Sequence, residues 1–131
     1  MSTIFTKIVN KEIPCHLIKE DDRFLAFLDV MPLVEGHVLV IPKQEVDYIF
    51  DLEPELLGDL MKFAQTIASA IKKAIPCKRV GVAVIGLEVP HAHVHLVPMN
   101  RMLDINFSQE KMKPSAESLA KTAELIRSFL L

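Results

Sequence analysis

The sequence predicts a single α+β domain built on a mostly antiparallel sheet of five strands, with one long helix and one C-terminal helix. Three observations support this fold class. Five short stretches are apolar or alternate in the manner of strands, and two longer stretches have the helical period. The 131 residues suffice for one hydrophobic core but not for two. We therefore expect one domain over residues 1–131.

The N-terminal part of the chain contributes a short helix and three strands. Residues 4–9 form an amphipathic opening of about one helical turn. Residues 15–20 and 24–29 form a hairpin around the Asp21-Asp22 turn. Residues 37–42 are rich in β-branched and apolar side chains, which predicts a central strand that ends at Pro42.

The remaining elements are a long helix, two strands and a terminal helix. Pro54 suits the first turn of a helix, and Pro76 ends the apolar pattern that follows it. The apolar positions recur every three or four residues: Leu57, Leu60, Ala64, Ile67, Ile71 and Ile75. Residues 79–85 and 90–98 are predicted strands, and the last helix starts near Pro114-Ser115.

Three of the five histidines fall within one stretch, Pro90–Pro98. His91, His93 and His95 alternate with apolar residues, so on a strand their imidazoles share one face. A buried imidazole must satisfy two ring nitrogens, which makes an idle row of three costly. The row therefore indicates chemistry near neutral pH. A transition-metal site is the alternative, because alternating histidines on a strand also bind zinc.

Composition excludes several classes of partner. The net charge of −2 argues against a nucleic-acid surface, and no apolar run is long enough to span a membrane. The N-terminus lacks the pattern of a secretory signal. Cys15 and Cys77 have no metal-like spacing, and two free thiols are typical of a cytoplasmic protein.

The pattern His-φ-His-φ-His-φ-φ, where φ is apolar, resembles the motif of the histidine triad family of nucleotide hydrolases and transferases. Further likenesses occur in the family's order at residues 3–8, 11–14, 20–22, 26–29 and 36–43. The resemblance covers residues 1–100 and leaves 101–131 as a variable segment with a terminal helix. It implies a homodimer with one larger continuous sheet, a purine nucleotide substrate and no cofactor.

The resemblance also implies roles for individual residues. His93 is expected to be the nucleophile, His95 to bond a phosphate oxygen, His91 to support His93 and His37 to complete the cluster. Asp29 falls where the family binds ribose hydroxyls. Apolar residues fall where the family holds the base: Ile4, Phe5, Ile8, Phe27 and Val30. The residues alone leave other readings open, since an aspartate in a turn often caps it and buried aromatic residues are often plain core.

The implied reaction is attack on the α-phosphate of a nucleoside phosphoramidate or a dinucleoside polyphosphate, through a nucleotidyl-histidine. A neutral imidazole needs no separate base for this attack, and no step requires a metal. The expected donors to the developing charge on phosphate are the neighbouring imidazoles.

The chain departs from the family at several positions. Thr3 and Thr6 replace the Cys-x-x-Cys that holds zinc in some members, and Glu45 replaces a histidine. Leu87 and Glu88 stand where two branches place glutamine and then serine or threonine. These changes leave open a nucleotide-binding protein with little turnover. They also allow Glu88 to pair with a cationic leaving group.

Overall fold

The computed structural model describes residues 2–130 and confirms the predicted α+β class. Its five strands are β1 (Leu17–Glu20), β2 (Phe24–Leu28), β3 (Val38–Pro42), β4 (Arg79–Ala83) and β5 (Val94–Met99). They form one sheet in the order β1-β2-β3-β5-β4, and every neighbouring pair is antiparallel. The helices are α1 (Ile4–Val9), α2 (Pro54–Ala74) and α3 (Ala116–Arg127), with short 3-10 helices η1 (Ile49–Asp51) and η2 (Met102–Ile105).

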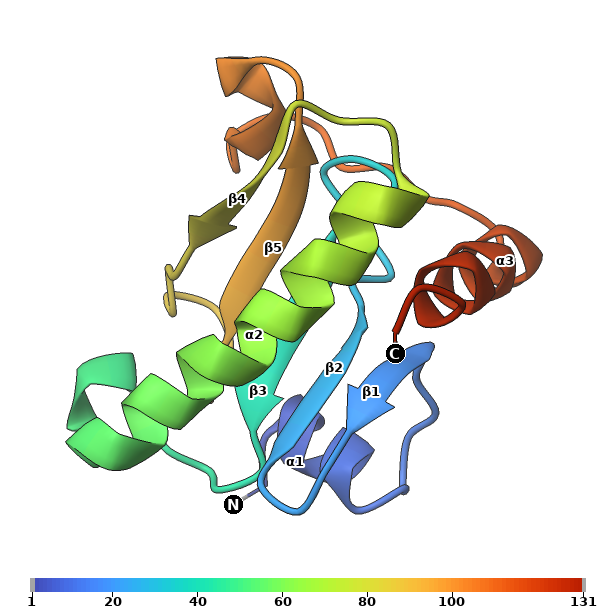
Figure 1. Cartoon of the computed structure of the whole chain (residues 1–131). Coiled ribbons are helices and arrows are strands. Elements are labelled where there is room, and N and C mark those ends of the chain that lie inside the picture. Colours follow the sequence, from blue (N-terminus) through green and yellow to red (C-terminus); the bar gives the residue numbers. More distant parts are fainter. Residues whose placement is uncertain (1, 131) are drawn as a thin grey trace.

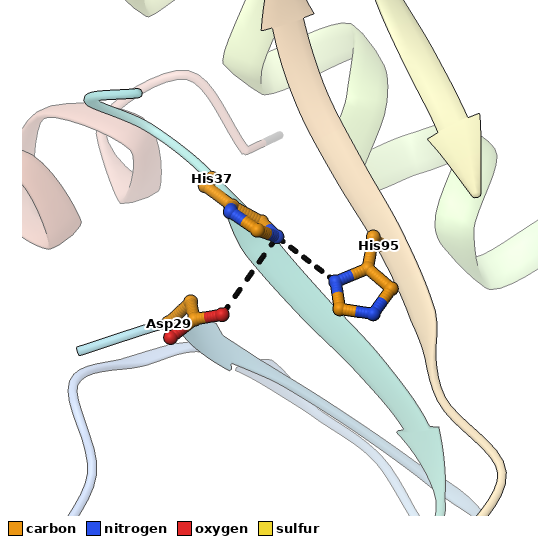
Figure 2. A group of neighbouring side chains, drawn as sticks. All are labelled: Asp29, His37 and His95. Carbon is orange, nitrogen blue, oxygen red and sulfur yellow. Dashed lines mark hydrogen bonds and ion pairs between the residues drawn. The ribbon is translucent and has the colours of Figure 1, made fainter. Parts of the chain in front are cut away.

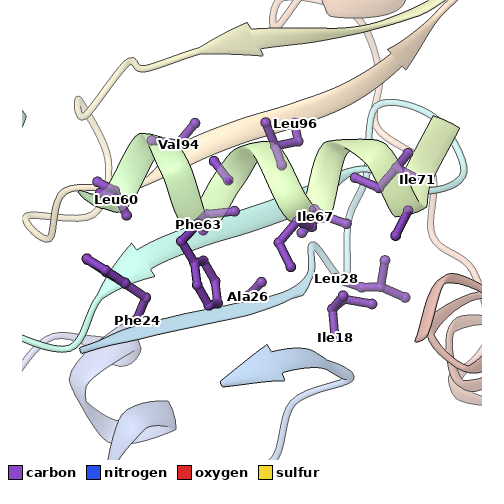
Figure 3. Packing of buried hydrophobic residues seen from close by; sticks show 14 of the residues in the cluster. Ile18, Phe24, Ala26, Leu28, Leu60, Phe63, Ile67, Ile71, Val94 and Leu96 are labelled. Carbon is purple, nitrogen blue, oxygen red and sulfur yellow. The ribbon is translucent and has the colours of Figure 1, made fainter. Parts of the chain in front are cut away.

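Helix α2 covers one face of the sheet and builds the main core (Figures 1 and 3). Leu60, Ile67 and Ile71 are fully buried on its inner side. They pack against alternate strand residues such as Ala26 and Leu96. Figure 3 shows these side chains between the helix and the strands. The three-and-four spacing seen in the sequence is therefore the stripe that the helix presents to the sheet.

The other face of the central strands carries a second, smaller core. Phe27 of β2 and Leu39 of β3 are register partners that point to this face, where Phe5 and Ile8 of α1 cover them. His95 of β5 is the register partner of Leu39, so its imidazole lies on the same face. β2 and β3 are buried on both faces, which explains their uninterrupted apolar sequences.

The C-terminal helix packs beside β1 at the end of the sheet (Figure 1). Leu119, Ala123 and Ile126 are buried in the main core, as their spacing predicts. A guanidinium nitrogen of Arg127 donates to the carbonyl of Leu17 at 2.6 Å and attaches the helix to β1.

Three predicted strand boundaries are wrong by two residues or more, and the first is the start of β1, which lies at Leu17 instead of residue 15. β4 ends at Ala83 instead of residue 85, and β5 begins at Val94 instead of residue 90. Between them the chain forms a loop in which Gly86 has a φ of +75°. Glycine adopts this left-handed conformation without strain, and Pro90 has no N–H to donate to a strand neighbour. Among residues 2–130 no helix is long and apolar enough to cross a membrane.

We predict that Ile67→Ala lowers the free energy of unfolding by roughly 2–5 kcal/mol, because it leaves a cavity between α2 and the sheet. Urea unfolding measures the change. The exposed neighbour Gln65 supplies the control, and Gln65→Ala is expected to shift the same value by no more than about 0.5 kcal/mol. Similar losses in both variants contradict this assignment of the core.

Candidate active site

Four histidines lie together on the face of the sheet that carries α1. His95 belongs to β5, His37 immediately precedes β3, and His91 and His93 lie in the segment just before β5. Only His95 is therefore a strand residue, and the alternating pattern begins in the irregular segment before the strand. The ring centroids of His93 and His95 are 4.9 Å apart, and those of His37 and His95 are 5.2 Å apart. All four side chains are buried.

Backbone carbonyls determine the proton positions on His91 and His93. Nε2 of His91 lies 2.8 Å from the carbonyl oxygen of Pro42, and Nδ1 of His93 lies 2.7 Å from the carbonyl oxygen of His91. A carbonyl only accepts, so each of these nitrogens must carry a proton. In a neutral ring the other nitrogen is then unprotonated. His93 consequently keeps a lone pair on Nε2.

A second pair of hydrogen bonds orients His37 and His95, and Figure 2 shows the one that joins the two rings. The backbone N–H of Leu33 donates to Nδ1 of His37 at 3.1 Å, so the proton of the neutral ring is on Nε2. Nε2 of His37 then donates to Nδ1 of His95 at 2.9 Å. The remaining proton of His95 is on Nε2, where it can be donated to a ligand.

Burial keeps these two rings uncharged at neutral pH. It lowers the pKa of His37 to about 4, helped by the positive charge of Lys111 and by the adjacent His93. It lowers the pKa of His95 to about 3, helped by His37, His93 and Lys111. Burial also lowers the pKa of His91. The hydrogen bonds of His37, His91 and His95 described above are therefore those of neutral imidazoles.

The N-terminus of α1 is attached to His91 by a polar network. Thr3 caps α1, and its hydroxyl lies 3.0 Å from Nδ1 of His91. Oε1 of Glu45 accepts from the Thr3 backbone N–H at 2.9 Å and from the Thr6 hydroxyl at 2.6 Å. These are the positions that resemble a zinc site in some relatives. They do not fit structural zinc here, because hydroxyls replace the two thiolates and hydrogen bonds already satisfy the group.

Asp29 follows β2 and uses its two carboxylate oxygens differently. Oδ1 accepts from the backbone N–H of Met31 at 2.9 Å, which is the turn role that its sequence position allows. Oδ2 lies 3.8 Å from Nε2 of His37, beside the histidine cluster. Burial raises the pKa of Asp29. One carboxylate thus supports the turn and also faces the site.

Asp29, His37 and His95 also form a group whose possible ligand atoms lie within 4.8 Å of one another. The close pair in this group is a hydrogen bond, with Nε2 of His37 and Nδ1 of His95 sharing one proton at 2.9 Å. A cation bound to both nitrogens must displace that proton. Metal binding here therefore competes with the bond that orients His95.

The apolar residues expected around the base fall into two groups. Phe5, Ile8 and Phe27 are buried in the smaller core, and the ring of Phe5 packs edgewise on His93 at 5.0 Å. Ile4 and Val30 are 51% and 56% exposed, so a ligand can reach them. The first group therefore supports the site from within the protein.

Glu88 is exposed in the loop that precedes the histidines, and its charge contributes to the raised pKa of Asp29. Two residues near the site were not predicted. The ring of Phe107 lies 4.7 Å from that of His95, and the charge of Lys111 acts on His37, His95 and Asp29. Both come from the irregular segment after β5, where no periodic pattern indicated a contact.

The family model for the HIT domain matches residues 10–102, which is more than half of the chain. The chain belongs to the HIT family. A Hit-like protein from Bartonella henselae has a TM-score of 0.85 and 34% identity to this HIT protein, over 98% of this chain and 97% of that one.

Two further relatives are informative about chemistry. A zinc-bound histidine triad family protein from Mycobacterium smegmatis has a TM-score of 0.81 and 29% identity, over 99% of this chain and 94% of that one. An adenosine 5′-monophosphoramidase from Schizosaccharomyces pombe is 34% identical over 99 residues, which span 75% of this chain and 74% of the relative.

We predict that stability falls as the pH is lowered from 7 to 5. The unfolded chain protonates its histidines near pH 6.5, whereas folded His37 and His95 stay neutral down to about pH 4 and 3. Each such group costs about 1.4 kcal/mol per pH unit within that window. Urea unfolding at pH 7, 6 and 5 measures the slope. His95→Asn is expected to reduce it, and an unchanged slope argues against a buried neutral His95.

Proposed function

We propose that this HIT protein hydrolyses a nucleoside phosphoramidate through a nucleotidyl-histidine formed on His93. The observation that carries the proposal is the 2.7 Å hydrogen bond from Nδ1 of His93 to the carbonyl of His91. It leaves the Nε2 lone pair available as a nucleophile without a separate base. The Schizosaccharomyces pombe relative, an adenosine 5′-monophosphoramidase, supports this reaction class and adenosine as the first base to test.

The reaction divides into two displacements at phosphorus. Nε2 of His93 forms a bond to the α-phosphorus while the bond to the leaving amine breaks, and the amine takes a proton from solvent as it departs, which balances the proton that the attacking water releases in the second step. The His93 ring becomes positively charged, and the His91 carbonyl that accepts its Nδ1 proton stabilises that charge. Water then attacks the same phosphorus, releases the nucleoside monophosphate and restores the neutral ring.

His95 is the proposed donor to the phosphate in both steps. Its Nε2 proton is directed by the bond that Nδ1 receives from His37, so the donor is oriented before substrate arrives. Phosphoryl transfer depends chiefly on such positioning and charge stabilisation. The same geometry accepts a dinucleoside polyphosphate, in which a phosphate group is the leaving group.

The nucleoside is proposed to bind beside the cluster. Asp29 presents Oδ2 to ribose hydroxyls while Oδ1 remains bonded to the turn. Exposed Ile4 and Val30 supply apolar surface for a purine, and buried Phe5 supports it beneath.

A nucleotide-binding protein with little turnover is the second candidate function, and one loop favours it. Leu87 is 88% exposed and has no polar group, while Glu88 brings a negative charge toward the site. Neither side chain can donate to a phosphate. Binding of adenosine monophosphate without turnover of any phosphoramidate supports this candidate.

We also propose that a second copy of the chain pairs with β4. This strand forms one edge of the sheet, and exposed apolar residues lie on it and just beyond it, at Val82, Val84 and Ile85. An apolar edge strand left uncovered invites pairing. We propose the cytoplasm as the compartment of this protein. Cys15 and Cys77 are free thiols, which suits that reducing environment.

The nucleophile is tested by comparing His93→Ala with His95→Ala. We predict that His93→Ala reduces release of adenosine monophosphate from adenosine phosphoramidate to background. His95→Ala retains measurable activity, because one lost donor costs about two to three orders of magnitude. Brief reaction with labelled substrate should leave acid-labile label on the peptide spanning residues 91–95.

The assay runs in excess chelator, which also tests the metal alternative. Activity lost to chelator and restored by zinc contradicts the mechanism. Equal residual activities in the two variants, together with no covalent adduct in the wild type, contradict His93 as the nucleophile.

The dimer is tested by placing a charge on the apolar edge. We predict that the wild type is a dimer by light scattering at micromolar concentration and that Val82→Glu shifts it to monomer. Phe50→Glu removes an exposed apolar side chain from η1, far from β4 in sequence, and is the matched control. A monomeric wild type refutes the pairing.

A further inference from the structure

The segment that follows η2 returns to the histidine cluster, and we name residues 106–112 the strap. In Figure 1 this part of the chain connects the turns after β5 with α3. The ring of Phe107 lies 4.7 Å from His95 and 6.1 Å from His37. At the other end, the N–H of Met112 donates to the carbonyl of Pro32 at 2.9 Å. The strap is therefore attached near both of its ends, to the rings of His37 and His95 and to the backbone carbonyl of Pro32.

The second attachment places the end of the strap beside Asp29. Pro32 is three residues after Asp29, and Met112 lines a small cavity together with Asp29 and His37. Lys111 lies immediately before Met112, between the two attachment points. It is partly buried, and among residues 2–130 it forms no ion pair.

The charge of Lys111 reaches the groups that surround the proposed phosphate position. It lowers the pKa of His37 and of His95, and it opposes the rise in the pKa of Asp29. The Lys111 ammonium thus acts on His95, on His37, which orients His95, and on the Asp29 carboxylate. A phosphate bound beside these groups needs a positive counter-charge, because its other neighbours are neutral imidazoles and the carboxylates of Asp29 and Glu88.

We infer that Lys111 binds the phosphate of the nucleotide and that the strap holds it in place through Phe107 and Met112. The inference rests on the proposed nucleotide site. It explains how a site with Leu87 and Glu88 in the preceding loop can hold a dianion: the positive partner comes from the other side, after β5. An ammonium paired with phosphate forms charge-assisted hydrogen bonds, which are stronger than neutral ones. Lys111 also favours substrates that carry further negative charge beyond the α-phosphate.

Binding of adenosine monophosphate and adenosine, measured by calorimetry, separates the phosphate contribution from that of the nucleoside. Lys111→Met is expected to weaken binding of the monophosphate about tenfold to a hundredfold, the scale of a charged hydrogen bond, while adenosine binding is unchanged. Lys111→Arg is expected to retain most of the affinity. Lys113→Met is the matched control, because it removes the same charge from an exposed position two residues away.

The outcomes distinguish this inference from the proposed function. If wild type binds the monophosphate and Lys111→Met binds it equally well, Lys111 is not a phosphate ligand. Equal losses in Lys111→Met and Lys113→Met mean a general effect of net charge and also overturn the inference. If wild type binds neither ligand, the nucleotide site itself is wrong. Lys111→Gln also removes the charge but keeps a polar side chain. If Lys111→Gln and Lys111→Met bind the monophosphate equally weakly and both unfold in urea like the wild type, the missing charge and not a damaged fold causes the loss.

Discussion

The hydrogen bond between the His91 carbonyl and Nδ1 of His93 is the interaction on which the site depends. It converts an ordinary imidazole, whose proton can sit on either nitrogen, into one with a defined lone pair. The carbonyl can play this part because His91 precedes β5, in a segment that turns instead of pairing with a strand: its N–H donates to the carbonyl of Val89. A ladder hydrogen bond at His91 would have engaged that oxygen with a neighbouring strand.

Backbone groups control the other rings in the same way. The Pro42 carbonyl orients His91, and the Leu33 N–H orients His37, which in turn orients His95. Main-chain groups move little and do not titrate, so these proton positions do not depend on further ionisable residues. Burial has a cost, since neutral imidazoles disfavour the fold in acid, but it keeps His37 and His95 neutral, with their hydrogen bonds directed.

The two ends of the chain complete the site from opposite sides. The start of α1 brings Thr3 and Phe5 to His91 and His93. The strap brings Phe107 to His95, and the charge of its Lys111 acts on His37 and His95. The sheet and the segments beside it supply the histidines, and the two ends of the chain supply the residues around them.

The sequence by itself determined the fold class, the order of elements and the identity of the histidine cluster. Periodicity identified α2 and the central strands because both bury a regular stripe, and alternation brought His91, His93 and His95 to one face. It placed the start of β5 too early, since alternation describes an extended chain whether or not a neighbour pairs with it. Only the tertiary structure joined Thr3, Thr6 and Glu45 to His91, and Phe107 to His95. These contacts link residues far apart in the chain through single hydrogen bonds or ring contacts, and neither leaves a periodic trace in the sequence.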